Sequence, residues 1–141
     1  MKILIMGLPG SGKTYLAERL VPLLSCAWFN ADNIRKMSND WDFSLEGRER
    51  QSKRMRTFSD FEKKNGRMVI CDFVCPTEET RKYFNADIVI WMDTIERGRF
   101  EDTNSIFEKP IKVDYHITEW NEKNHLELAN SILKKWKKWK K

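Results

Sequence analysis

A glycine-rich segment near the start of the chain, GLPGSGKT, matches the phosphate-binding pattern G-x-x-x-x-G-K-[ST]. In such loops the glycines let backbone N–H groups converge on phosphate oxygens, the lysine bridges the outer phosphates, and the last hydroxyl holds Mg²⁺. A strand-like apolar segment enters this loop and an amphipathic helix-like segment leaves it, as the pattern requires. We therefore predict a nucleoside triphosphate site, with ATP and Mg²⁺ as cofactors, formed by Gly7, Leu8, Pro9, Gly10, Ser11, Gly12, Lys13 and Thr14.

A second polar cluster, Asp32, Asn33 and Arg35, follows the short apolar segment CAWF. By itself an Asp-Asn pair is typical of a turn or a helix cap. Beside a phosphate-binding loop it has another interpretation, because ligands of parallel sheets bind beyond the carboxyl ends of the strands. Phosphoryl transfer to an alcohol needs a carboxylate near the acceptor hydroxyl. We therefore predict that Asp32 acts in catalysis together with Lys13.

Five short apolar segments are spaced along the chain and predict the strands of one sheet. They are residues 2–6, 26–29, 67–73, 86–92 and 111–117. Segments with helical periodicity lie between and after them, at residues 13–24, 45–64, 77–84 and 126–136. Strands that alternate with helices predict an α/β fold, with a five-stranded, mostly parallel sheet and helices on both faces.

Some parts of this pattern carry more detailed expectations. In residues 45–64, Met55, Phe58 and Phe61 predict one thin apolar stripe. Residues 111–117 alternate apolar and polar side chains, which predicts an edge or half-buried strand. Residues 97–110 show no regular periodicity. The apolar face expected on the last helix consists of Leu126, Ala129, Ile132, Leu133 and Trp136.

The length and charge of the chain limit the classes of protein it can be. Its 141 residues fit a single domain, residues 1–141, with one sizeable core. The net charge is +5, but six lysines lie in the tail at residues 134–141, so the rest of the chain carries −1. This argues against a nucleic-acid partner, since a nucleic-acid groove needs positive charge across the body. For the tail we favour packing and solubility, with attachment to nucleic acid or membrane as the alternative.

The apolar segments and cysteines point to a cytoplasmic protein. No apolar segment approaches the ~18 residues of a membrane span, and the apolar start is shorter than a signal-peptide core. Cys26, Cys71 and Cys75 are odd in number and lack CxxC spacing. They favour neither a disulfide framework nor a zinc site. Two of them lie in or beside an apolar segment, and we expect these to be small core residues.

Several classes of protein use a phosphate-binding loop, and the chain favours one of them. Motors and GTPases need longer chains for switch and base-recognition elements, and no NKxD-like guanine signature follows a predicted strand. A compact five-stranded domain suits a kinase that phosphorylates a small acceptor.

Motifs downstream of the loop resemble those of the adenylylsulfate kinase family, over roughly residues 1–107 and in the same order. ADNIRK is similar to GDNxR, and DFSLEGRERQSKR is similar to GFSxxDRxxNxRR. DFVCP, MDT and EDTNSIF resemble xFISP, VDT and RDxKGLY. The resemblance implies a three-layer P-loop kinase fold and transfer of phosphate from ATP to the 3′-hydroxyl of adenylyl sulfate.

The resemblance also implies roles for individual residues. Asp32 would orient or deprotonate the ribose 3′-hydroxyl. Arg35 and Arg48 would hold the phosphosulfate, and Phe43 would stack on the adenine. Gln51 keeps an amide where the family has Asn. An aromatic face and guanidinium groups suit an adenine-bearing anion, although Phe43 is also compatible with a core position and Arg48 with a solvated helix face.

The chain departs from the family pattern around the metal. Asn30 replaces an acidic residue, whereas Asp72 is an acid where the pattern has none. We therefore expect Thr14 and Asp72 to hold Mg²⁺. Cys75 stands in place of the serine of xFISP, and we expect it to be structural.

The lid-like segment departs as well, and the chain lacks tens of residues that are usual for the family. Glu101 and Asn104 replace basic residues. Arg97 and Arg99 are nearby cations that we expect to contact the nucleotide phosphates, with a solvated pair as the alternative.

The leading interpretation is an ATP-dependent kinase of adenylyl sulfate or a similar nucleotide. One alternative is a P-loop kinase of another nucleotide, a nucleoside or a small metabolite. Another is a nucleotide-binding module with weak catalysis. The expected partner is the nucleotide substrate, and a homodimer is left open.

Overall fold

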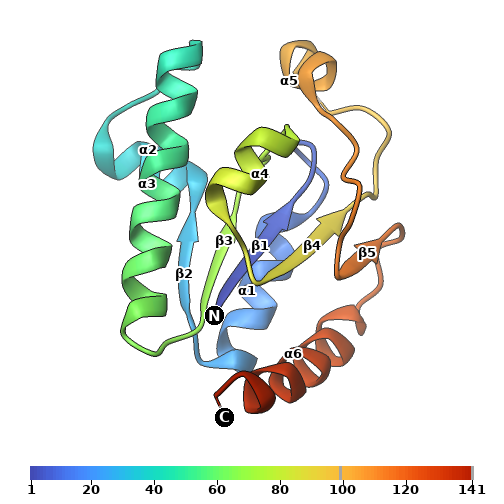
Figure 1. Cartoon of the computed structure of the whole chain (residues 1–141). Coiled ribbons are helices and arrows are strands. Elements are labelled where there is room, and N and C mark those ends of the chain that lie inside the picture. Colours follow the sequence, from blue (N-terminus) through green and yellow to red (C-terminus); the bar gives the residue numbers. More distant parts are fainter. Residues whose placement is uncertain (99, 141) are drawn as a thin grey trace.

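The computed structural model describes residues 1–98 and 100–140, which form one five-stranded sheet with six helices (Figure 1). The strands are β1 (Lys2–Met6), β2 (Ala27–Asn30), β3 (Val69–Asp72), β4 (Ile88–Met92) and β5 (Tyr115–Ile117). The helices are α1 (Lys13–Leu24), α2 (Ala31–Ser38), α3 (Leu45–Lys64), α4 (Glu78–Phe84), α5 (Glu101–Ile106) and α6 (Asn124–Lys140). The strand order is β2-β3-β1-β4-β5, and every neighbouring pair is parallel.

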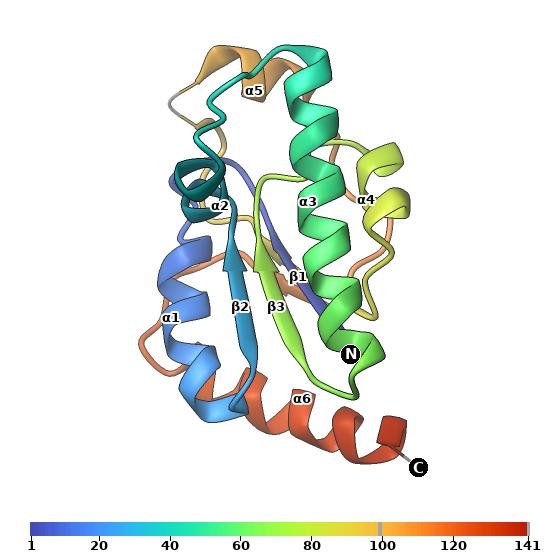
Figure 2. The ribbon, with the colours of Figure 1, turned by 90° about the vertical axis from the view of Figure 1, so that its left-hand side faces the viewer.

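The sheet is covered on both faces, which confirms the predicted architecture. Successive side chains of the central strand β1 point to opposite faces, so Ile3 and Ile5 join one apolar cluster while Leu4 and Met6 join another. The first cluster lies under α1 and α6, and the second lies under α3 and α4. Figure 2 shows the sheet between these two helical layers. Burial on both faces explains why the strands are continuously apolar.

The edge strand is shorter than the alternation predicts, since β5 covers only Tyr115–Ile117 of the expected residues 111–117. The Asp114 carboxylate accepts a hydrogen bond from the backbone N–H of Val89 at 2.8 Å. A side-chain oxygen therefore takes the place of the backbone acceptor that a longer β5 would offer to Val89. Pro110, four residues before Asp114, also disfavours an earlier start of the strand because it has no N–H to donate.

The apolar stripe expected on α3 is correct for Met55 and wrong for the two phenylalanines. The buried residues of this helix are Gly47, Gln51, Met55, Ser59 and Glu62, whereas Phe58 is exposed and Phe61 is 65% exposed. Helix α3 packs closely against α4 and β3, where a small or hydrogen-bonded side chain fits better than a phenyl ring. Ser59, for example, satisfies its hydroxyl by donating to the Met55 carbonyl at 2.8 Å.

Two short helices lie where none was predicted. Helix α2 begins directly after β2, capped by Asn30, whose side-chain oxygen accepts from the Asn33 backbone N–H. Helix α5 lies inside the segment 97–110, whose composition suggested irregular structure. Both contain few apolar residues, so the sequence offers little helical periodicity at these positions. No helix in the described part of the chain is long and apolar enough to cross a bilayer.

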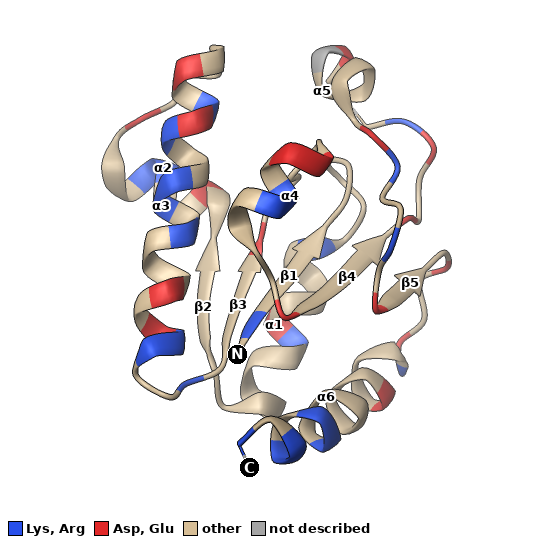
Figure 3. Ribbon diagram, in the orientation of Figure 1, with Lys and Arg blue, Asp and Glu red and all other residues tan. Residues whose placement is uncertain are grey.

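Helix α6 packs on α1 through Leu128, Ala129 and Ile132, while the expected Leu126 is half exposed. Leu133 and Trp136 pack against the same cluster and are partly buried, as predicted. The lysines of the tail lie at the end of the molecule away from α2 and α5 (Figure 3). Among the described residues, none of the tail lysines forms an ion pair with a carboxylate.

Candidate functional site

The phosphate-binding loop joins β1 to α1, with the backbone geometry that its glycines allow. Gly12, directly before α1, has φ of 99°, a left-handed value that strains any other residue. At Gly7 a side chain would meet the end of β4, since a Cβ there would lie 2.5 Å from the Met92 carbonyl oxygen. The loop is thus pressed against the carboxyl ends of the central strands, with the helix N-terminus behind it.

Lys13 supplies the positive charge of this loop. Its Nζ donates to the Leu8 carbonyl at 2.9 Å, so the ammonium group lies back over the loop. Burial lowers the pKa of Lys13 to about 8, while the carboxylates of Asp72 and Asp32 act in the opposite direction. A poorly solvated cation that is close to two carboxylates is suited to a polyanion such as a triphosphate.

Asp72, at the end of β3, accepts hydrogen bonds from three side chains of two other elements. The Thr14 hydroxyl donates at 2.9 Å, the Asn30 amide at 2.9 Å and the Trp28 indole N–H at 2.7 Å. Burial raises the pKa of Asp72, and these three donors and Lys13 limit the increase. The carboxylate is therefore fixed in orientation beside the first residues of α1.

This arrangement fits Mg²⁺ with phosphate oxygens, and it does not fit a metal held by protein ligands alone. Within residues 1–98 and 100–140, no group of three or more His, Cys, Asp or Glu side chains could hold a metal ion. Mg²⁺ is usually held by one or two protein oxygens together with water and substrate phosphates. Thr14 and Asp72 present such oxygens next to the loop.

Sequence reasoning did not identify Trp28, and it treated Asn30 only as a lost charge. The structure gives Asn30 two more tasks, because it caps α2 and its amide also contacts the Thr14 hydroxyl at 3.1 Å. A signal was present: Trp28 and Asn30 are two residues apart on one strand and therefore share a face. Thr94, after β4, also supports the loop by donating to the Ser11 carbonyl at 2.7 Å.

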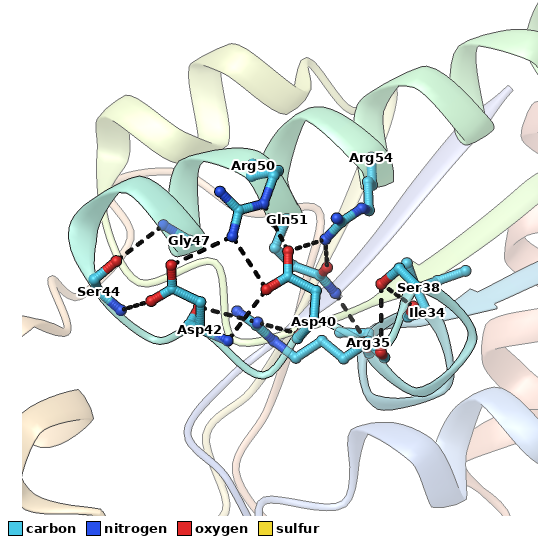
Figure 4. A network of polar contacts seen from close by, with 11 residues as sticks. Ile34, Arg35, Ser38, Asp40, Asp42, Ser44, Gly47, Arg50, Gln51 and Arg54 are labelled. Atoms are coloured by element: carbon cyan, nitrogen blue, oxygen red, sulfur yellow. Dashed lines mark hydrogen bonds and ion pairs between the residues drawn. The ribbon is translucent and has the colours of Figure 1, made fainter.

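The residues expected around the acceptor lie on α2, α3 and the connecting segment. Figure 4 shows two of them, Arg35 and Gln51. Phe43 is 56% exposed, and the Arg35 guanidinium lies 4.2 Å from the centre of its ring. Gln51 is buried and donates to the Ala31 carbonyl at 2.9 Å, which links α3 to the start of α2. Arg48 is half-buried on the first turn of α3. Asp32 is exposed on the first turn of α2.

The lid-like segment is engaged in its own contacts. Arg97 forms an ion pair with Glu101 across four residues. The Asn104 side chain exchanges two hydrogen bonds with the backbone of Gly98, at 2.8 and 3.0 Å. Arg99, the other cation expected to reach the phosphates, lies outside the described residues.

The cysteines behave as small core residues in part, as expected from sequence. Cys71 and Cys75 are buried and Cys26 is half-buried, and all three are free thiols. Cys75 has φ of 46°, and its carbonyl accepts from the Arg81 guanidinium at 3.0 Å. The position therefore has a structural contact in the turn before α4.

Comparison with known proteins shows the family to which this chain belongs. The model of the family described as "Adenylylsulphate kinase" matches residues 1–96. The chain belongs to the adenylylsulphate kinase family. A "Probable adenylyl-sulfate kinase" from Aeropyrum pernix is 35% identical over 86 residues, which cover 55% of this chain and 45% of that protein. The chain thus matches less than half of the length of this curated relative.

Solved structures support the same fold. The Mycobacterium tuberculosis APS kinase CysC, in complex with AMPPNP and APS, superposes with a TM-score of 0.73 at 19% identity, over 94% of this chain and 95% of the other. Shikimate kinase from Aquifex aeolicus gives a TM-score of 0.65 at 18% identity, over 97% of this chain and 96% of the other. The chain therefore has the three-layer P-loop kinase fold that its sequence predicts.

Proposed function

We propose that this chain transfers the γ-phosphoryl group of ATP to the 3′-hydroxyl of adenylyl sulfate. The observation that carries the proposal is the position of Asp72, which accepts from the Thr14 hydroxyl at 2.9 Å and from the Asn30 amide at 2.9 Å. Thr14 directly follows Lys13 of the phosphate-binding loop, and Asn30 caps the helix that carries Asp32. The residues that we propose for the donor phosphates, for Mg²⁺ and for the acceptor hydroxyl therefore lie at the same end of the sheet. Membership of the adenylylsulphate kinase family supports adenylyl sulfate as the acceptor.

The proposed reaction assigns one step to each group. The ribose 3′-oxygen attacks the γ-phosphorus, its proton passes to Asp32, and the bond to the β–γ bridging oxygen breaks so that ADP leaves. Lys13 and the loop N–H groups stabilise negative charge on the β- and γ-phosphates. Mg²⁺, when bound at Thr14 and Asp72, neutralises charge on the same oxygens.

The acceptor would lie on the side of α2 and α3. The exposed face of Phe43 is suited to stack on adenine. Arg48 has no ion pair among the described residues, so a cation is available there for an anionic acceptor.

The test is a panel of acceptors with Mg-ATP: adenylyl sulfate, AMP, nucleosides, small metabolites and oligonucleotide ends, with ADP release as the readout. We expect adenylyl sulfate to be preferred. Asp32→Asn should lower kcat roughly 100-fold or more and leave ATP affinity unchanged, since it removes only the proton acceptor. Lys13→Ala should abolish transfer and weaken ATP binding. Glu18→Gln, an exposed carboxylate on α1, is the control and should change neither.

One observation favours a second candidate, a nucleotide-binding module with weak catalysis. The Arg97 guanidinium is paired with Glu101, so its charge is neutralised rather than offered to the phosphates. In that case every acceptor would give slow ADP release while ATP still bound. A preference for another alcohol in the panel would instead indicate a kinase of a different metabolite.

A further inference from the structure

Arg35 is engaged by the protein itself in a way that differs from a free anion-binding guanidinium. It is only 5% exposed, and its Nη1 donates to the carbonyl oxygens of Asp40 at 2.9 Å and Asp42 at 3.2 Å. The same guanidinium lies over the Phe43 ring, with its Cζ 4.2 Å from the ring centre. The Arg35 side chain therefore contacts both the backbone of residues 40–42 and the ring of Phe43.

The carboxylates of the same segment are fixed to α3 (Figure 4). The Asp40 carboxylate receives Arg50 Nε at 2.6 Å and Arg54 Nη1 at 2.8 Å. Arg50 also reaches Asp42 at 3.3 Å. Residues 40–43, which we call the acceptor segment, are thus held between Arg35 of α2 and two arginines of α3.

Local hydrogen bonds complete the acceptor segment. The backbone N–H of Asp40 donates to the Arg35 carbonyl at 3.0 Å, and that of Ser44 donates to the Asp42 carboxylate at 2.9 Å. Each of these amides is a reporter of the segment, because its exchange with solvent requires the segment to open. Neither reporter depends on any ligand.

We propose that Arg35 is a positioning residue that fixes Phe43 for stacking, and that Arg48 supplies the charge for the acceptor anion. This proposal rests on the function proposed above for the acceptor. Arg35 covers one face of the Phe43 ring, and the other face remains for the base. The two arginines that the family motifs share therefore divide their tasks: one orders the stacking ring and the other meets the charge.

Arg35→Lys separates the two roles, because lysine keeps the charge but cannot lie flat on a ring while donating to two carbonyls. In the protein without ligand, we expect hydrogen exchange at the amides of Asp40 and Ser44 to become roughly tenfold faster, while the centre of α3 is unchanged. Arg56→Lys is the matched control, since Arg56 also lies over an aromatic ring, that of Tyr83, at 4.7 Å. It should leave the acceptor segment unchanged. Unaltered exchange in Arg35→Lys would overturn the proposal.

Acceptor binding, measured by calorimetry with adenylyl sulfate and with adenosine, gives the second test. Arg35→Lys should weaken both ligands by a similar factor, roughly five- to twentyfold, and should have less than about a twofold effect in a Phe43→Ala background. Arg48→Met should weaken adenylyl sulfate more than adenosine and should add to Phe43→Ala. ATP affinity should be unchanged in all of these variants.

The outcomes separate this proposal from the function on which it rests. If Arg35→Lys and Phe43→Ala were additive, or if Arg35→Met selectively weakened adenylyl sulfate, Arg35 would contact the anion directly and the proposal would be wrong. If wild type bound neither adenosine nor adenylyl sulfate, the proposed acceptor would be wrong. The exchange experiment would still decide whether Arg35 orders the acceptor segment.

Discussion

At the residue scale, the expected Mg²⁺ site differs from the family motifs in the strand that carries its carboxylate. Asn30 and Asp72 are paired in register on β2 and β3, and the Asn30 amide donates to the Asp72 carboxylate at 2.9 Å. The family motifs have an acid at the position of Asn30 and none at that of Asp72. One carboxylate is therefore present in both cases, carried by adjacent positions.

Asn30→Asp should destabilise the protein because it replaces a donor to Asp72 by a second carboxylate. We expect a loss of about 1–3 kcal/mol in the free energy of unfolding, because Asp72 loses one of its three donors and faces a like charge instead. The double variant Asn30→Asp with Asp72→Ser should recover most of this loss, since one carboxylate and one donor again face each other. Urea unfolding at pH 7 measures both. Equal stability of the single and double variants would contradict this interpretation.

The three thiols should be poorly reactive in the native protein. Burial raises the pKa of Cys26 to about 11 and that of Cys75 to about 12, and it also raises the pKa of Cys71. Only the thiolate is alkylated, so at pH 8 iodoacetamide should react roughly 100-fold or more slowly than with the urea-unfolded chain. Because the ionised fraction grows with pH below the pKa, the native rate should rise with pH. A fast native thiol at pH 8 would indicate an activated cysteine.

At the element scale, the start of α3 and the acceptor segment depend on one glycine. Gly47 lies in the first turn of α3, and Ser44 caps this helix by accepting from its backbone N–H at 3.3 Å. A Cβ at Gly47 would collide with the carbonyl group of Asp42. The helix and the segment can approach this closely only without a side chain at that position.

Gly47→Ala should therefore displace the acceptor segment, even though alanine is the better helix former by about 1 kcal/mol. We expect a net loss of about 1–3 kcal/mol in stability, as for other overpacked sites. Acceptor affinity should fall with it, while ATP affinity stays constant. Lys53→Ala, at an exposed position of the same helix, is the control. Thermal unfolding and calorimetry test the two effects, and a more stable Gly47→Ala variant would show that the contact is loose.

At the scale of the whole molecule, the two ends of the sheet have separate tasks. The phosphate-binding loop, α2 and α5 lie at the carboxyl ends of the strands, whereas the lysine-rich end of α6 lies at the opposite end (Figures 1 and 3). Trp136 packs against the core cluster of α1 and α6, and its ring stacks on Trp139 with centres 5.4 Å apart. The tail therefore contributes packing far from the expected chemistry.

Ending the chain after Leu133 should lower stability and spare activity. Removal of Trp136 uncovers apolar surface of the core cluster, and we expect a loss of about 1–3 kcal/mol, comparable to the burial of one large side chain. Values of kcat and KM should stay within about twofold of wild type, since the described tail residues lie at the opposite end of the molecule from the loop. Steady-state kinetics and urea unfolding are the measurements. Loss of activity in a folded truncated protein would place the tail in the site.

The sequence by itself determined the features that belong to single segments. The phosphate-binding loop, the central apolar strands and their alternation with α1, α3, α4 and α6 follow from local sequence patterns, and they suffice to predict the α/β fold. The candidate residues Lys13, Asp32 and Asp72 were also identified in this way, because each follows a strand or completes a motif.

Tertiary structure alone decided which groups meet. Asp72 lies 44 residues from Trp28 and 58 residues from Thr14 along the chain, so no local pattern reveals that their side chains share hydrogen bonds. The buried face of α3 was likewise set by its neighbours α4 and β3, which select small and hydrogen-bonded residues over phenyl rings. The contacts of Arg35 follow the same rule. Its sequence position marks a guanidinium near the site, but burial against residues 40–43 depends on how α2 and α3 pack.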